Sequence, residues 1–122
     1  MGGPVVLVAE DDASVRMTLE FVLKDEGFEV LLAEDGQQAL RVAQDSLPDV
    51  ILLDQIMPKM DGKEVLTALR SHGPTSEIPV LILSGMARGE PGEWPGAHFV
   101  GKPFSPDALV ERIRKVLDNN QA

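Results

Sequence analysis

Acidic, hydroxyl and basic residues follow the short apolar segments of this sequence, and their types could carry out phosphoryl chemistry. Glu10 and Asp11 follow the first apolar segment, Asp54 the third and Ser84 the fourth, and Lys102 comes soon after the fifth. Carboxylates without histidine or cysteine ligands favour a hard cation such as Mg²⁺, which usually binds one or two carboxylates together with phosphate oxygens. A carboxylate can also be the nucleophile that receives a phosphoryl group.

The other two residues, Ser84 and Lys102, have side chains that could bind the phosphoryl group. Three carboxylates in one pocket repel one another unless a cation is present. Lys102 could place a positive charge near one phosphate oxygen, and Ser84 could donate a hydrogen bond to another. The residues therefore predict an aspartyl-phosphate site with bound Mg²⁺ or Mn²⁺.

Five apolar segments must bring these residues together. They alternate with helical patterns, which is typical of a parallel sheet in an α/β fold. Ligands bind such a sheet beyond the carboxyl ends of its strands. Continuous apolar character in the first, third and fourth segments predicts strands that are covered on both faces. The predicted strands are residues 5–9, 30–33, 50–53, 80–83 and 98–100.

Helix signals separate the predicted strands. Asp12 is a candidate N-cap for a helix that stops at Gly27, and further helices are expected over about 37–46 and 63–72. Ser105 caps a last helix, with Pro106 in its first turn. The stretch 85–96 contains four glycines and two prolines, so we expect a loop or at most one helical turn there.

Length and composition limit the classes of protein to which the chain can belong. Its 122 residues predict one domain over 1–122, ordered over about 4–119. A net charge of −9 argues against direct nucleic-acid binding, and the absence of cysteine excludes disulfides and thiolate sites. No apolar run approaches membrane-spanning length, and the first residues lack a secretory signal pattern. We therefore expect a cytoplasmic location and no membrane contact.

Four segments of the sequence resemble the receiver domains of two-component response regulators. They read VVLVAEDD at 5–12, LDQIMPKMDG at 53–62, LSG at 83–85 and GKPF at 101–104. The likeness covers nearly the whole chain, and the second segment is the most specific. The resemblance implies a flavodoxin-like, doubly wound, five-stranded parallel sheet in the order 2-1-3-4-5 with helices on both faces. In that pattern the fourth helix is shortened here, or replaced by the loop at 85–96.

The resemblance also implies the residues of a metal site. Asp54 is then the phospho-acceptor and a metal ligand, beside Asp11, which binds Mg²⁺ directly. The main-chain carbonyl of Ile56 is a third protein ligand, and Glu10 binds through a water molecule. Met86 and Ile56 flank the acceptor, and their apolar side chains predict slow self-dephosphorylation.

By the same resemblance, phosphorylation switches the conformation of the domain. Ser84 takes the place of the switch hydroxyl, Phe99 that of the switch aromatic, and Lys102 pairs with the phosphoryl group. The phosphodonor is a histidine kinase or a histidine phosphotransfer protein, which docks near residues 14, 15, 18, 103 and 104. A downstream protein target and a monomeric or weakly dimeric state are also expected. Such a domain catalyses only its own phosphorylation and slow dephosphorylation, so it is not an enzyme acting on other substrates.

Other functions remain as alternatives. An aspartate-nucleophile phosphohydrolase would need a second aspartate two residues after Asp54, where this sequence has Ile56. An unphosphorylated docking module would keep the fold without the chemistry. A flavodoxin-like cofactor protein is disfavoured, because acids rather than a phosphate-binding loop follow the first strand. With no output domain expected in the chain, a free-standing regulator, a phosphorelay shuttle and a receiver cut from a longer protein would look alike.

Overall fold

The computed structural model describes residues 3–55, 57, 59–84, 97–101 and 105–121, with main chain only at 84 and 119–121. Five parallel strands form one sheet in the order β2-β1-β3-β4-β5. The strand order and the parallel pairing confirm the fold that the sequence predicts. The strands are β1 (Val5–Ala9), β2 (Glu29–Ala33), β3 (Val50–Asp54), β4 (Val80–Ser84) and β5 (Ala97–Gly101).

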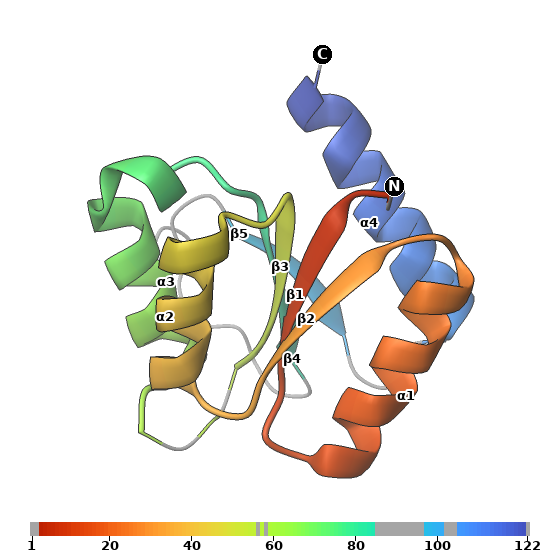
Figure 1. Cartoon of the computed structure of the whole chain (residues 1–122), viewed down its shortest axis with the longest axis horizontal. Helices are drawn as coiled ribbons and strands as arrows, with labels where there is room; N and C mark the ends of the chain where they lie inside the picture. The colour runs from red at the N-terminus through yellow and green to blue at the C-terminus, as the bar shows by residue number, and fades with distance from the viewer. Residues whose placement is uncertain (1–2, 56, 58, 85–96, 102–104, 122) are drawn as a thin grey trace.

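Helices cover both faces of the sheet, as predicted (Figure 1). One face packs against α1 (Ala13–Asp25) and α4 (Pro106–Gln121), and the other against α2 (Gly36–Ser46) and α3 (Gly62–Ser71). A short 3₁₀ helix, η1 (Gly73–Thr75), follows α3. The prediction that a loop replaces a further helix at 85–96 lies outside the described residues. None of the described helices combines the length and apolar character that a membrane span requires.

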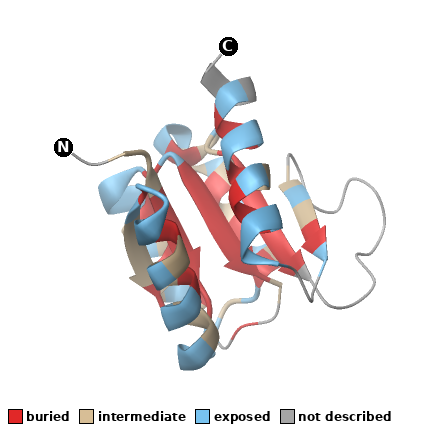
Figure 2. Cartoon of the chain, turned by 90° about the vertical axis from the view of Figure 1, so that its right-hand side faces the viewer, coloured by how far each residue is buried: buried red, intermediate tan, exposed pale blue. Residues whose placement is uncertain are grey.

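The alternation of side chains along each strand divides the core into two clusters. Val6 and Val8 of β1 pack on the side of α1 and α4, whereas Leu7 and Ala9 pack on the side of α2 and α3. These four residues are completely buried. Figure 2 shows buried strands at the centre and exposed outer faces on the helices. The predicted covering of the central strands on both faces is therefore confirmed.

Acidic N-caps fix where three of the helices begin. Asp12 caps α1 as predicted, and its Oδ1 accepts hydrogen bonds from the main-chain N–H groups of Ser14 (2.9 Å) and Val15 (3.3 Å). Asp35 caps α2 in the same manner. Asp61 caps α3 and forms a capping box with Glu64.

Candidate functional site

Strand register places two carboxylates side by side at the carboxyl edge of the sheet. Ala9 of β1 pairs with Leu53 of β3, so the next residues along the two strands, Glu10 and Asp54, are neighbours. Side chains alternate between the two faces of a strand, so Glu10 lies on the same face of the sheet as Val8, and Asp54 lies on that face too. This is the face covered by α1 and α4. Glu10 is 2% exposed and Asp54 is 8% exposed. Burying two carboxylates is costly unless charge or hydrogen bonds compensate.

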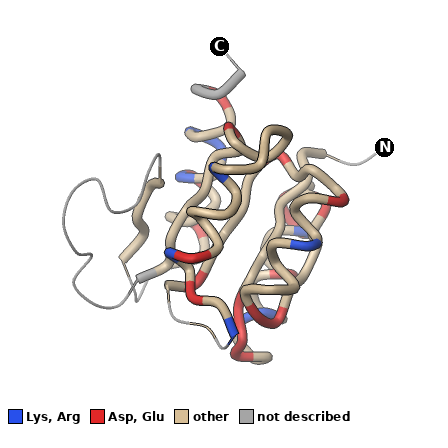
Figure 3. Tube along the Cα trace, turned by 90° about the vertical axis from the view of Figure 1, so that its left-hand side faces the viewer, with Lys and Arg blue, Asp and Glu red and all other residues tan. Residues whose placement is uncertain are grey.

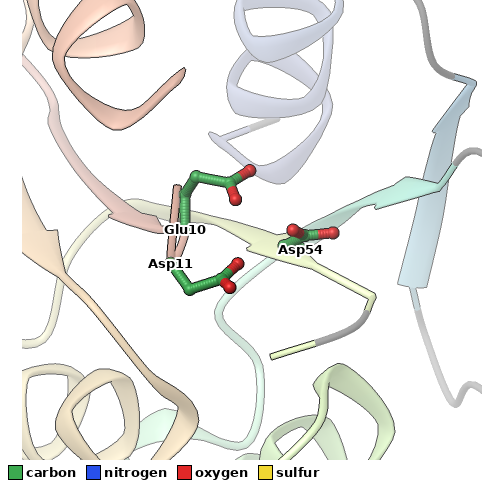
Figure 4. A group of neighbouring side chains, drawn as sticks. All are labelled: Glu10, Asp11 and Asp54. Atoms are coloured by element: carbon green, nitrogen blue, oxygen red, sulfur yellow. The ribbon is translucent and has the colours of Figure 1, made fainter. Parts of the chain in front are cut away.

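A third carboxylate completes the group. Glu10, Asp11 and Asp54 each offer one oxygen, and these atoms all lie within 4.8 Å of one another. Figure 4 shows the three side chains pointing into the same space from the ends of β1 and β3. Asp11 is exposed, so the group is open to solvent on its side. The structure thus brings together the three acidic residues that the sequence singled out.

The donor set suits a small, hard cation. All three ligands are carboxylate oxygens, which Mg²⁺ prefers. Two oxygens bound directly to one Mg²⁺ can lie at most about 4.2 Å apart, because each bond is about 2.1 Å long. Oxygens within 4.8 Å of one another are therefore close to the spacing that one shared Mg²⁺ requires.

Hydrogen bonds from the segment that joins β1 to α1, and from α1 itself, hold Glu10 and Asp11 in place. The N–H of Asp12 donates to Oε2 of Glu10 at 3.1 Å. The guanidinium of Arg16 donates to the main-chain oxygen of Glu10 at 2.8 Å and to that of Asp11 at 3.4 Å. The sequence reasoning did not select Arg16. A positive residue in the first turn of a helix, where the dipole disfavours it, was the signal that could have identified it.

The connection from β3 to α3 packs closely against its neighbours. The N–H of Gly62 donates to the oxygen of Gln55 at 3.0 Å. A Cβ added to Gly62 would lie 2.8 Å from the main-chain oxygen of Asp54, so only glycine fits there without a shift. Gly62 is therefore a packing residue for the acceptor strand as well as the first residue of α3.

The same connection also contacts the start of α2. A Cβ on Gly36 would lie 2.0 Å from the main-chain oxygen of Met60. Lys59 adopts a left-handed backbone with φ of 70°, and its Nζ lies 3.6 Å from Oδ2 of Asp35. The pKa of Asp35 is lowered, chiefly by the hydrogen bond from the N–H of Gln38 and then by the charge of Lys59. Gly36 is a second residue that the sequence analysis missed, since the contact joins segments far apart in the chain.

Of the other predicted site residues, the structure describes Ser84 and Phe99. Ser84 is the last residue of β4, where its register partner is Gly101 of β5. Phe99 of β5 is half-buried and packs against the cluster on the side of α2 and α3. Ile56, Met86 and Lys102, as well as residues 103 and 104, lie outside the described residues. Their predicted roles stay predictions.

Charge is unevenly placed on the molecule. The chain carries 20 acidic and 11 basic residues. Seen from the side of α2 and α3, acidic segments gather at the lower edge, where the strands end (Figure 3). A cation is attracted to such an edge, and a phosphate needs positive charge to approach it.

Comparison with known proteins assigns this architecture to one family. Residues 6–114 match the family described as "Response regulator receiver domain". The transcriptional regulatory protein PrrA of Mycobacterium tuberculosis is 42% identical over 118 residues, which cover 93% of this chain and 50% of that protein. The chain spans about half the length of such relatives, between 44% and 51% for three of them.

Solved structures show the same fold over whole chains. The receiver domain of the Francisella response regulator 1452 is 32% identical, with a TM-score of 0.87 over 96% of this chain and 98% of that one. The receiver domain of the Pseudomonas aeruginosa sensor histidine kinase PA1611 was solved with a magnesium ion coordinated in its active-site cleft. It is 25% identical, with a TM-score of 0.87 over 95% of this chain and 98% of that one.

Proposed function

Because the chain belongs to the response regulator receiver domain family, we propose that Asp54 accepts a phosphoryl group from a phosphohistidine donor in a Mg²⁺-dependent reaction. The donor is a histidine kinase or a histidine phosphotransfer protein, in keeping with receiver domains that interact with histidine kinases. The observation that carries the proposal is the meeting of Glu10, Asp11 and Asp54 at the carboxyl edge of the sheet.

The proposed phosphoryl transfer forms one bond and breaks one. A carboxylate oxygen of Asp54 attacks phosphorus, the phosphorus–nitrogen bond of the donor breaks, and the imidazole nitrogen leaves with the electron pair. With Asp54 only 8% exposed, its buried surroundings limit the directions of attack. Glu10 and Asp11 would hold the metal ion beside the acceptor. Bound Mg²⁺ would supply positive charge that offsets the carboxylates and the phosphoryl oxygens.

The remaining roles follow from the same proposal. Lys102 would pair with a phosphoryl oxygen, and Ser84 would move toward the phosphoryl group. Phe99, half-buried on the edge strand β5, would change its packing in response. Phosphorylation would thereby shift an equilibrium between two conformations that bind partners differently. The domain would act as a signalling phospho-acceptor and not as an enzyme with other substrates.

Mass spectrometry of the intact protein tests the proposal. The purified chain is incubated with acetyl phosphate in the presence of Mg²⁺ or of a chelator. We expect wild type to gain the mass of one phosphoryl group only with Mg²⁺, and Asp54→Asn to gain none. Asp45→Asn serves as the matched control, because Asp45 is an exposed carboxylate on α2.

Two results would contradict the proposal in different ways. Modification of Asp54→Asn to the wild-type extent would mean that another residue is the acceptor. An unmodified wild-type protein at saturating Mg²⁺ would instead support the docking module that does not use phosphorylation.

A further inference from the structure

Arg16 occupies a position where its charge does not favour the helix that carries it. It lies in the first turn of α1, at the positive end of the helix dipole. Its side chain is half-buried, and within the described part of the chain it forms no ion pair with a carboxylate. Its guanidinium instead donates to the main-chain oxygens of Glu10, at 2.8 Å, and Asp11, at 3.4 Å. The stability of α1 alone does not explain this residue.

The contacts of Arg16 belong to a group of hydrogen bonds around Glu10. Strand β1 ends at Ala9, and only the N–H of Glu10 continues its pairing with β2. The N–H of Glu10 donates to the oxygen of Ala33 at 3.1 Å. Its own oxygen accepts from Arg16, and its Oε2 accepts from the N–H of Asp12 at 3.1 Å. Neighbouring segments thus hold the main chain and the carboxylate of Glu10.

We propose that Arg16 is a positioning residue for the cation site formed by Glu10, Asp11 and Asp54. The proposal rests on the metal-binding part of the proposed function. Three carboxylates within 4.8 Å repel one another, and free rotation of the main chain after β1 would let two of them turn away. By holding both main-chain oxygens, Arg16 keeps the carboxylates directed at Asp54 before a cation arrives. Binding of the cation then orders less of the protein, so its entropic cost is smaller and the affinity for the cation rises.

Geometry and charge make different predictions for substitutions of Arg16. One nitrogen of the rigid, planar guanidinium, Nη1, donates to both oxygens, whereas a lysine ammonium is a point charge on a shorter, flexible chain. Arg16→Lys keeps the positive charge and loses the rigid, planar donor group. Arg16→Met keeps a long unbranched side chain and loses both. Positioning therefore predicts weaker Mg²⁺ binding in both variants. A purely electrostatic role predicts wild-type binding in Arg16→Lys and tighter binding in Arg16→Met, because a positive charge beside the site repels the cation.

Titration of the unphosphorylated protein with Mg²⁺ alone, followed by amide NMR shifts, measures the dissociation constant. We expect Arg16→Met to raise it about tenfold, the typical effect of removing a residue that supports a metal ligand, and Arg16→Lys to fall between Arg16→Met and wild type. Arg41→Met is the matched control, because Arg41 is exposed on α2, and its dissociation constant should equal that of wild type. Urea unfolding of each variant shows whether the titrations compare folded proteins.

The dependence of phosphorylation on Mg²⁺ gives a second readout. With acetyl phosphate as donor, Arg16→Met should need about tenfold more Mg²⁺ for half-maximal rate and approach the wild-type rate at saturation. Wild-type affinity in both Arg16 variants would overturn the proposal, and so would tighter binding in Arg16→Met, which would assign the effect to charge. If wild type binds Mg²⁺ but gains no phosphoryl group, the proposed function fails while the titration still decides the role of Arg16.

Discussion

The close contact between α2 and the segment before α3 predicts an unusual outcome for a glycine-to-alanine substitution. In the first turn of a helix, alanine normally stabilises relative to glycine, by up to about 1 kcal/mol. At Gly36, however, the new Cβ would lie 2.0 Å from the oxygen, 2.7 Å from the carbonyl carbon and 2.5 Å from the Cβ of Met60. Non-bonded carbon contacts are normally about 3.5 Å or longer, so helix and loop would have to separate by more than about 1 Å.

The magnitude follows from the balance of these two terms. Forcing one extra carbon into a packed site costs about 1–3 kcal/mol, and here the obstacle is main chain, which cannot rotate away as a flexible side chain can. After subtracting the helix gain, we expect Gly36→Ala to lower the free energy of unfolding by about 1–2 kcal/mol. For a domain of this size the melting temperature should fall by roughly 5–10 °C.

Urea unfolding followed by circular dichroism measures the effect. A lower midpoint with an unchanged dependence on urea would show a loss of stability without a change in the unfolded state. Gly101→Ala is the control, because a Cβ there meets none of the described residues within 4 Å, and its midpoint should stay close to wild type. A Gly36→Ala protein as stable as wild type, or more stable, would refute the packing argument.

Three further predictions concern sites away from the acidic group. Leu47 is 49% exposed and has a left-handed backbone with φ of 47°, so Leu47→Gly should raise the free energy of unfolding by about 1 kcal/mol in urea titrations. Thr75 is completely buried and its Oγ1 donates to two main-chain oxygens at 2.8 and 3.2 Å, so Thr75→Val should cost about 1–3 kcal/mol in the same assay. The pKa of His98 is lowered below 6.5 by desolvation and then by the charges of Arg112 and Arg70. The unfolded chain therefore binds the proton first, stability should fall as the pH drops below 6.5, and His98→Gln should flatten that slope.

Local signals in the sequence were sufficient to predict the elements of the fold, whereas the strand order came from the resemblance to receiver domains. Continuous apolar runs in β1, β3 and β4 predicted strands covered on both faces, and these strands are the inner ones of the sheet. The N-cap at Asp12 and the left-handed glycine at Gly27 delimited α1 within a residue or two. Each of these features depends on neighbours along the chain, so single-sequence reasoning can detect it.

The supports of the site were not predictable in the same way. In the sequence, only its place in the first helical turn distinguishes Arg16 from an ordinary helix surface residue, and Gly36 is an ordinary residue after an N-cap. Their roles arise from distances across space, from a guanidinium to main-chain oxygens and from the Cβ position of residue 36 to the oxygen of Met60. The sequence shows the type of each residue but not the space that the fold leaves for its side chain. The candidate metal ligands could therefore be identified from the sequence, whereas the residues that orient them could not.

The packing of the sheet and the geometry of the acidic site both depend on the register between β1 and β3. Side chains alternate along β1 and β3, so a shift of one residue in their register would turn Glu10 and Asp54 to opposite faces. The same shift would move Val8 or Leu52, whichever strand slipped, out of the cluster beneath α1 and α4 and into the packed cluster on the other face. The cost of repacking both clusters therefore also keeps two mutually repelling carboxylates together. The hydrophobic core supplies the free energy that a cluster of like charges cannot supply for itself.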